Sequence, residues 1–192
     1  MRALVIVIAG TLFCASTLAW TQPEGRIRLA ADVGGLSCNI DDAAPGILYV
    51  HMLITERTDV TGVQFAAPKP ACWVGATWLS DQIAFPVYIG DSQNNFYGGL
   101  SIGLGSCLSS PIYLGAIVYM TQGQAQPCCV YTVVKTYDLL PGIPTPIVAT
   151  CDFVEDGINA GYAVVNAQPN CTCDEPVSTE DRTWGALKAL YE

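Results

Sequence analysis

The chain has 192 residues, 51% of them apolar, and its 8 basic and 17 acidic residues give a formal net charge of −9 at pH 7. The length suits one domain, and the apolar content is enough for a hydrophobic core. An acidic chain without a cluster of Lys or Arg repels phosphate backbones and anionic lipid, which argues against nucleic acid as a partner.

The first predicted element is an export signal over residues 1–19. Arg2 precedes an apolar run over residues 3–13, and Thr17 and Ala19 occupy positions −3 and −1 of a cleavage site. The run is too short for a stable membrane span, and no later stretch approaches the roughly 20 apolar residues of a spanning helix. We therefore expect a secreted protein, extracellular or periplasmic, without a membrane span after cleavage.

Short apolar runs with the two-residue period of β-strands follow. Residues 26–31 alternate, residues 47–55 are apolar on both faces and indicate a central strand, and residues 62–66 place Val63 and Phe65 on one face. Further strands are predicted at 73–79, 84–89, 100–104, 112–120, 130–136, 147–153 and 162–166, with a break at 80–82 and a polar loop at 90–99. Because no helical period separates these runs, we predict an all-β antiparallel sandwich over residues 20–173.

The last predicted element is a C-terminal tail, residues 174–192. Residues 174–181 are acidic, contain proline and form a linker. Thr183 then caps a short amphipathic helix. Its apolar face comprises Trp184, Leu187, Leu190 and Tyr191. This face either packs on the sandwich or serves as a docking or sorting tail.

Eight cysteines lie beyond the predicted signal, and an even number outside the cytosol predicts disulfides that brace the sandwich. They are Cys38, Cys72, Cys107, Cys128, Cys129, Cys151, Cys171 and Cys173. The sequence leaves their pairing open. In an extended segment the adjacent Cys128 and Cys129 point to opposite faces and need different partners, whereas Cys171 and Cys173 share a face and can both reach a neighbouring element.

Metal binding by these cysteines is not expected, because neither close pair has the Cys-x₂₋₄-Cys spacing of structural zinc sites. Two polar loops suit calcium better, since several oxygen ligands fall within one turn. Their candidate ligands are Asp91, Asn94, Asp152 and Asp156. A structural calcium ion is the one cofactor that the sequence suggests.

Catalysis would have to be built around His51, the single histidine of the chain. Its strand is otherwise apolar, with Tyr49 and Leu53 on the same face, so we expect a hydrogen-bonded core histidine. No Gly-x-Ser-x-Gly elbow or glycine-rich phosphate loop is present. The sequence therefore predicts a protein that is not an enzyme. A secreted hydrolase that uses loop carboxylates is an alternative, although no spacing selects a pair.

Three segments carry a resemblance to a known family: residues 47–55, residues 59–65 (Asp-Val-Thr-Gly-Val-Gln-Phe) and residues 115–119 (Gly-Ala-Ile-Val-Tyr). They resemble strands of cohesin-like and carbohydrate-binding-like β-sandwich domains. The resemblance covers residues 47–120, departs from the family pattern at 66–70, and does not extend to the eight cysteines. The whole layout also resembles exported Cys-rich bacterial proteins. Both resemblances imply binding or assembly at the cell exterior.

The favoured hypothesis is a non-catalytic binding or adhesion module, secreted or at the cell surface, that recognises a glycan or a protein. Aromatic faces stack on sugars and anchor protein interfaces. The candidate contacts are Trp73, Trp78, Phe96 and Tyr97, of which the two tryptophans could instead belong to the core. The alternative is a structural subunit of an extracellular filament or surface layer, self-associating through sheet edges or the tail.

Overall fold

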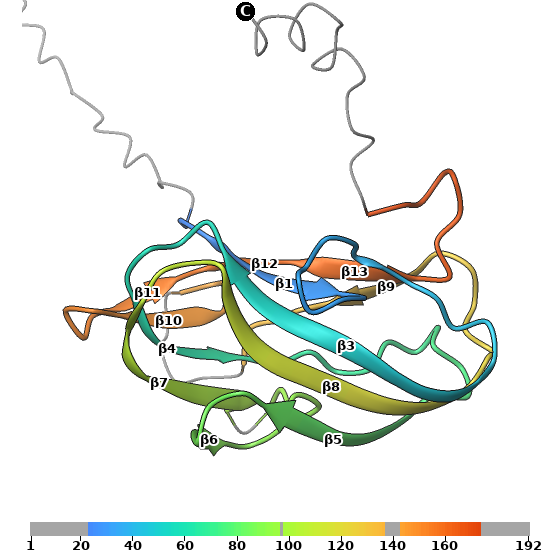
Figure 1. Cartoon of the computed structure of the whole chain (residues 1–192), viewed down its shortest axis with the longest axis horizontal. Coiled ribbons are helices and arrows are strands. Elements are labelled where there is room, and N and C mark those ends of the chain that lie inside the picture. Colours follow the sequence, from blue (N-terminus) through green and yellow to red (C-terminus); the bar gives the residue numbers. More distant parts are fainter. Residues whose placement is uncertain (1–22, 97, 137–142, 174–192) are drawn as a thin grey trace, which may run out of the picture.

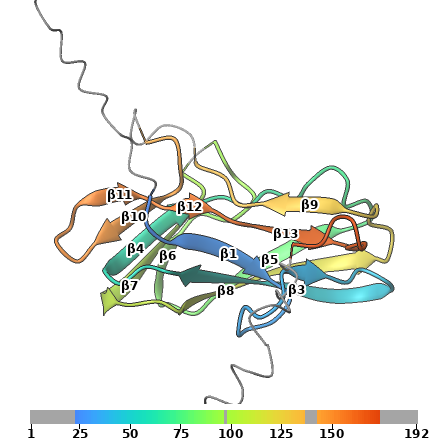
Figure 2. The ribbon, with the colours of Figure 1, turned by 90° about the horizontal axis from the view of Figure 1, so that it is seen from above.

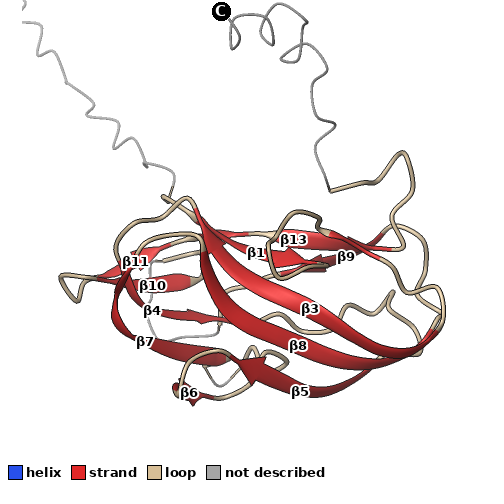
Figure 3. Ribbon diagram, viewed as in Figure 1, coloured by secondary structure: helices blue, strands red, loops and turns tan. Residues whose placement is uncertain are grey.

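All regular secondary structure in the described part of the chain is β-structure (Figures 1 and 3). The structure, a computed structural model, describes residues 23–96, 98–136 and 143–173. Thirteen strands form three sheets there. This arrangement confirms the predicted all-β sandwich. The predicted signal over 1–19 and the predicted C-terminal helix lie outside the described residues.

The first sheet has five strands, with the long strand β3 at its centre (Figure 1). Neighbouring strands are antiparallel except for β12, which runs parallel to β1. The spatial order is β12 (Asn159–Ala160), β1 (Arg26–Ala30), β3 (Pro45–Thr55), β8 (Ile112–Gln122) and β5 (Thr77–Ile83). The central position predicted for residues 47–55 is therefore confirmed.

The second sheet is antiparallel throughout. Its order is β11 (Glu155–Gly157), β10 (Ile147–Thr150), β4 (Val60–Phe65), β7 (Leu100–Leu108) and β6 (Val87–Ile89). A small third sheet follows the order β2 (Asn39–Ile40), β13 (Tyr162–Val165) and β9 (Cys129–Thr132). A backbone bridge between Ala66 and Val134 links the third sheet to the second.

The hydrophobic core lies between the first and second sheets, and strand alternation selects its members. Val50, Met52 and Ile54 of β3 are buried, as are Val63 and Phe65 of β4. Gln64 lies between the last two on the opposite face, as the sequence predicts. β7 contributes the buried side chains of Leu100, Ile102 and Leu104.

Two features of the strand prediction are wrong. β5 begins at Thr77 and continues through the polar residues 80–82, where a break was predicted. This strand lies at the edge of the first sheet and shifts register between Trp78 and Ser80. An edge strand can expose the side chains of Ser80 and Gln82 to solvent without losing its pairing. The strands β2, β11 and β12 have only two or three residues, too few to show a period in the sequence.

Four disulfides among the described residues connect the short strands to one another, to the segment after β13 and to the rest of the sandwich. Cys128 bonds to Cys171 and Cys129 bonds to Cys72, so the two adjacent cysteines have different partners, as predicted. Cys173 bonds to Cys38, next to β2, whereas Cys171 reaches the start of β9. The pair near the C-terminus therefore bonds to two elements, on either side of β13, rather than to one. The fourth disulfide joins Cys107 to Cys151.

Three aromatic rings fill one end of the core. The ring centroids of Trp73 and Tyr119 are 4.6 Å apart, and Tyr131 packs edge-on against both. The amide of Gln93 donates to the Tyr119 hydroxyl at 3.0 Å. The Tyr131 hydroxyl, 2.9 Å from that of Tyr119, donates to the carbonyl of Ala67 at 2.6 Å. Burial raises the pKa of Tyr119 to about 12 and the pKa of Tyr131 well above its usual value.

These two tyrosines predict a loss of stability at alkaline pH. Their pKa values are higher in the folded chain than in the unfolded chain, because burial favours the neutral hydroxyls. The contribution of these neutral hydroxyls to the free energy of unfolding is therefore complete below about pH 10 and is lost as the pH rises toward about 12. Denaturant titrations across this range should show a falling free energy of unfolding. Tyr119→Phe should reduce the slope. A free energy that stays constant up to about pH 12 would contradict the burial of these hydroxyls.

Candidate binding face

The aromatic residues predicted to contact a partner lie in different environments. Trp73 is fully buried, and its indole N–H donates to Asp42 Oδ2 at 3.0 Å. This corrects the prediction of a partner contact at Trp73, because a partner cannot reach its ring. Trp78 is half-buried on β5 and donates to Asp81 Oδ1 at 3.2 Å. Phe96 is 67% exposed in the loop after β6, and Tyr97 lies outside the described residues.

Two of the three carboxylates predicted to bind calcium, Asp91 and Asp156, are engaged with the protein itself. Asp91 Oδ1 accepts backbone N–H groups of Gln93 and Asn94, both at 2.9 Å. Asp156 Oδ2 accepts a hydrogen bond from Arg57 at 2.9 Å, while Asp152 is exposed in the turn between β10 and β11. Among the described residues no group of three or more His, Cys, Asp or Glu side chains could hold a metal. Calcium at Asp91, Asn94, Asp152 and Asp156 stays a prediction.

His51 lies on the outer face of β3, not in the core. The alternation of this strand turns Ile47, Tyr49 and His51 away from the second sheet, which corrects the expectation that His51 is a core residue. The hydrogen bond itself is present, since His51 Nδ1 lies 3.0 Å from the Tyr113 hydroxyl. Burial lowers the pKa of His51, and the charge of Asp32 partly opposes this shift. The imidazole therefore resists protonation.

The outer face of the second sheet is the strongest candidate for binding. At its edge, β6 exposes Val87 by 63% and Ile89 by 77%. Next to β6, the outward positions of β7 and β4 carry small or polar residues: Ser101, Gly103, Gly62 and Gln64. The partly exposed Ala149 and the exposed carboxylate of Glu155 complete this surface, which we call the second-sheet face.

A shallow groove of about 290 Å³ crosses the second-sheet face. Gly62 of β4 pairs with Gly103 of β7, and Gly103 pairs with Val87 of β6. A Cβ atom at Gly103 would lie 3.5 Å from the nearest atom of Val87, an ordinary contact, and its backbone needs no positive φ. The backbone therefore does not require glycine at position 103. The absence of a side chain at Gly103 leaves the groove open.

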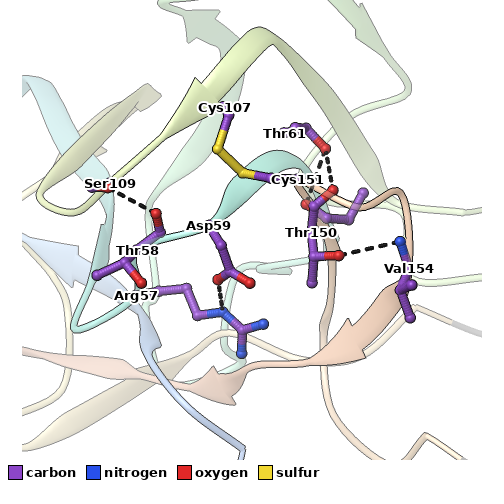
Figure 4. The surroundings of a disulfide bond; sticks show 10 residues. Arg57, Thr58, Asp59, Thr61, Cys107, Ser109, Thr150, Cys151 and Val154 are labelled. Carbon is purple, nitrogen blue, oxygen red and sulfur yellow. Dashed lines mark hydrogen bonds and ion pairs between the residues drawn. A yellow bond between two sulfur atoms is a disulfide. The ribbon is translucent and has the colours of Figure 1, made fainter.

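Both ends of the second-sheet face are held rigidly. At one end, Gly98 accepts a hydrogen bond from Gln64 Nε2 at 2.8 Å, and Ser92 donates to Asp81 from its backbone and its hydroxyl. At the other end, the disulfide from Cys107 holds Cys151 at the start of the turn between β10 and β11 (Figure 4).

That turn, residues 151–154, exposes an apolar tip. Phe153 is 85% exposed and has a φ of 59°, a strained value for an aromatic residue. Hydrogen bonds close the turn: Thr150 N–H donates to the carbonyl of Val154, and Val154 N–H donates to the Thr150 hydroxyl at 3.2 Å (Figure 4). The Thr61 hydroxyl donates to the carbonyls of Ala149 and Thr150. The tip is therefore fixed in place before any partner binds.

A buried guanidinium lies beneath the same turn. Arg57 pairs with Asp59 at 2.7 Å, as Figure 4 shows, and with Asp156 at 2.9 Å. The Arg57 side chain is buried, whereas both carboxylates are partly exposed to solvent. Burial opposes the charge of Arg57, but the two carboxylates outweigh it and raise the pKa of the guanidinium. This pairing ties the start of β4 to β11.

Sequence reasoning missed the second-sheet face. Val87 and Ile89 fell within a predicted strand, yet their exposure depends on β6 being the edge of its sheet. The signal available in the sequence was the pair of glycines, Gly62 and Gly103, inside alternating apolar runs, since glycine within a strand often marks a close approach of another backbone or a ligand. Their register across β4 and β7 could not be read from the sequence.

No protein-family model matches the chain, and no curated protein matches it. Among solved structures, it is similar to the cohesin module of a family 33 glycoside hydrolase from Clostridium perfringens, with 9% identity, a TM-score of 0.49 and coverage of 77% of this chain and 100% of that one. It is also similar to a structure of the type I cohesin–dockerin complex Coh-OlpA–Doc918 from Clostridium thermocellum, with 7% identity, a TM-score of 0.47 and coverage of 74% and 99%.

A type III cohesin module from the ScaE cell-surface anchoring scaffoldin of Ruminococcus flavefaciens is 14% identical, with a TM-score of 0.38 and coverage of 84% and 95%. These structures belong to the family that the sequence resembles. At such identities and TM-scores the likeness says nothing about what the chain binds. Separately, the described residues contain no helix with the length and hydropathy needed to cross a membrane.

The buried hydrogen bond between Trp73 and Asp42 should contribute to the stability of the fold. Asp42 Oδ2 accepts the indole N–H of Trp73 and the backbone N–H of Ala125, whereas its buried Oδ1 has no hydrogen-bond partner among the described residues. Asp42→Ala leaves two buried donors unsatisfied but also removes a poorly solvated oxygen. We expect unfolding to become easier by about 2 kcal/mol, measured by denaturant titration.

The matched control is Asp41→Ala, which removes the same charge from an exposed neighbour. This variant should unfold within about 0.5 kcal/mol of the parent chain. Equal stability of the two variants would mean that the contact between Trp73 and Asp42 does not hold this end of the core.

Proposed function

We propose that the protein is a non-catalytic protein-binding module that works outside the cytosol, and that its partner docks on the second-sheet face. The observation that carries this proposal is the exposed pair Val87 and Ile89 beside a groove that Gly103 leaves open. Exposed apolar surface rimmed by polar groups is typical of protein interaction sites. Covering it releases roughly 25 cal/mol for each Å² of apolar area removed from water.

The rigid frame around this face supports the same proposal. A surface that is already ordered loses little conformational entropy when a partner binds. The disulfide between Cys107 and Cys151 and the hydrogen bond from Gln64 to Gly98 order the two ends of the face before contact. Phe153, at the tip of the braced turn, offers an aromatic anchor of the kind that dominates protein interfaces.

A protein suits this surface better than a glycan. Sugar binding relies on flat aromatic platforms next to polar hydrogen-bonding groups. The exposed edge of the groove comprises the aliphatic Val87 and Ile89 together with a single aromatic residue, Tyr88, and this largely apolar edge fits the apolar side chains of another protein. The four disulfides support a location outside the reducing cytosol.

The test begins by identifying the partner through the proposed face. A photo-crosslinking amino acid replaces Ile89 in the full chain, and the crosslinked protein is identified from the secreted proteins of the organism that makes this chain. The purified partner is then titrated by calorimetry against two pairs of matched variants. Gly103→Val fills the groove and Ile89→Asp places a charge on its edge. We expect each to weaken binding by about tenfold or more.

The controls lie on the first sheet. Gly46→Val is the same substitution on β3, where an added Cβ meets nothing within 4 Å, and Ile47→Asp places the same charge at a comparably exposed residue. Both should bind within about twofold of the parent chain. Equal binding by all four variants would overturn the proposed face. A partner that proves to be a glycan, with protein binding absent, would overturn the proposed class.

A further inference from the structure

A second surface with a distinct charge lies on the first sheet, where β1 runs beside β12 and β13 (Figure 2). Arg26 and Arg28 both line a hollow of about 320 Å³ there. Tyr162, the first residue of β13, and Gly161 just before it also line the hollow. The disulfide partners Cys38 and Cys173 line it as well. We call this hollow the arginine groove.

The two guanidinium groups of the arginine groove have no carboxylate partner among the described residues. Arg57, by contrast, makes two ion pairs and is buried. Arg26 and Arg28 are two residues apart on one strand, so their side chains leave the same face, about 7 Å apart. Glu56 also lines the groove, and its single negative charge leaves the two arginines in excess. The chain as a whole has a net charge of −9, so the two arginines form a local region of positive charge that attracts an anionic group.

The chain supplies such an occupant at the edge of the groove itself. Cys173 lines the groove, and the next two residues are Asp174 and Glu175. The segment 174–181 carries four carboxylates and no Lys or Arg. Its point of departure is fixed, because Cys173 is bonded to Cys38, its backbone N–H donates to Asn39 Oδ1 at 3.1 Å, and Asn39 donates to the Thr172 hydroxyl at 2.8 Å.

We propose that the acidic segment 174–181 of the same chain occupies the arginine groove, with its carboxylates paired to Arg26 and Arg28. An extended residue advances about 3.3 Å, so the first few residues after Cys173 cover the spacing between the two arginines. Surface ion pairs within one chain are individually weak, so the segment is held by pairing with both arginines at once, and the expected protection is moderate. The site is independent of the proposed binding face, because it belongs to the other sheet.

The experiment measures protection of the segment from proteolysis in the full chain. Subtilisin cleavage between residues 174 and 182 is followed by mass spectrometry at low salt and at about 1 M NaCl, where the screening length falls to about 3 Å. We expect Arg26→Gln with Arg28→Gln to speed cleavage at low salt by roughly threefold to tenfold, and high salt to remove the difference.

The matched control is Thr77→Glu with Gln82→Glu, which changes the net charge by the same amount on exposed residues of β5, at the opposite edge of the first sheet. It should cleave like the parent chain. A second variant, Asp174→Asn with Glu175→Gln, alters no described residue, so it decides the outcome if the arginine variant fails to fold. Its ratio of low-salt to high-salt rates corrects for changes in protease preference, and this ratio should rise as in the arginine variant.

Two results would overturn the proposal. Equal low-salt rates in the parent chain, the tail variant and the control would show that the segment does not use the groove. Protection that disappears on dilution would assign the groove to the acidic segment of a second copy instead of the same chain. Protection that is independent of concentration and lost in both test variants supports the proposal.

Discussion

The third sheet is too small to hold itself in place, and covalent bonds compensate. Its strands have two, four and four residues, and a sheet of that size has little stability of its own in water. Three of the disulfides among the described residues hold this sheet. Cys72–Cys129 attaches β9 to the segment between β4 and β5. Cys38–Cys173 and Cys128–Cys171 bond the residues just before β2 and β9 to the segment that follows β13. The adjacent cysteines Cys128 and Cys129 are central, because they hold the start of β9 from both sides. We infer that the packing of Tyr131 of β9 against Trp73, at the aromatic end of the core, depends on the disulfides of Cys128 and Cys129.

The sandwich held by these disulfides has a filled interior and two outer surfaces of different chemistry. The aromatic residues with the greatest capacity for anchoring a partner, Trp73 and Tyr119, are used inside, where burial is complete. The outer side of the second sheet presents Val87 and Ile89 beside a groove that contains Gly62 and Gly103, and it ends at the exposed turn with Phe153. The first sheet offers positive charge at β1. The sandwich thus carries the proposed docking surface on the second sheet and the arginine groove on the first, and neither depends on the other.

The sequence was most informative where side-chain alternation was regular. Val63 and Phe65 share one face of β4 as predicted, and that face is buried, because their period of two matches a half-buried strand. β5 was misjudged because an edge strand tolerates the polar residues 80–82 that would interrupt a central one. His51 was placed in the core because one strand in isolation does not reveal which face is covered. The open groove at Gly103 depends on pairing between β4, β7 and β6, which are separated in the sequence, so strand-by-strand reasoning could not locate it.

The disulfide map of the purified, non-reduced protein tests the central claim most directly. Because Cys128 and Cys129 are adjacent, proteolysis should release one cluster in which the peptide with both cysteines is joined to a Cys72 peptide and a Cys171 peptide, and electron-transfer fragmentation should assign each bond. We predict that Cys129 is bonded to Cys72 and Cys128 to Cys171. Exchanged partners, a bond between Cys128 and Cys129, or free thiols at these positions would contradict it.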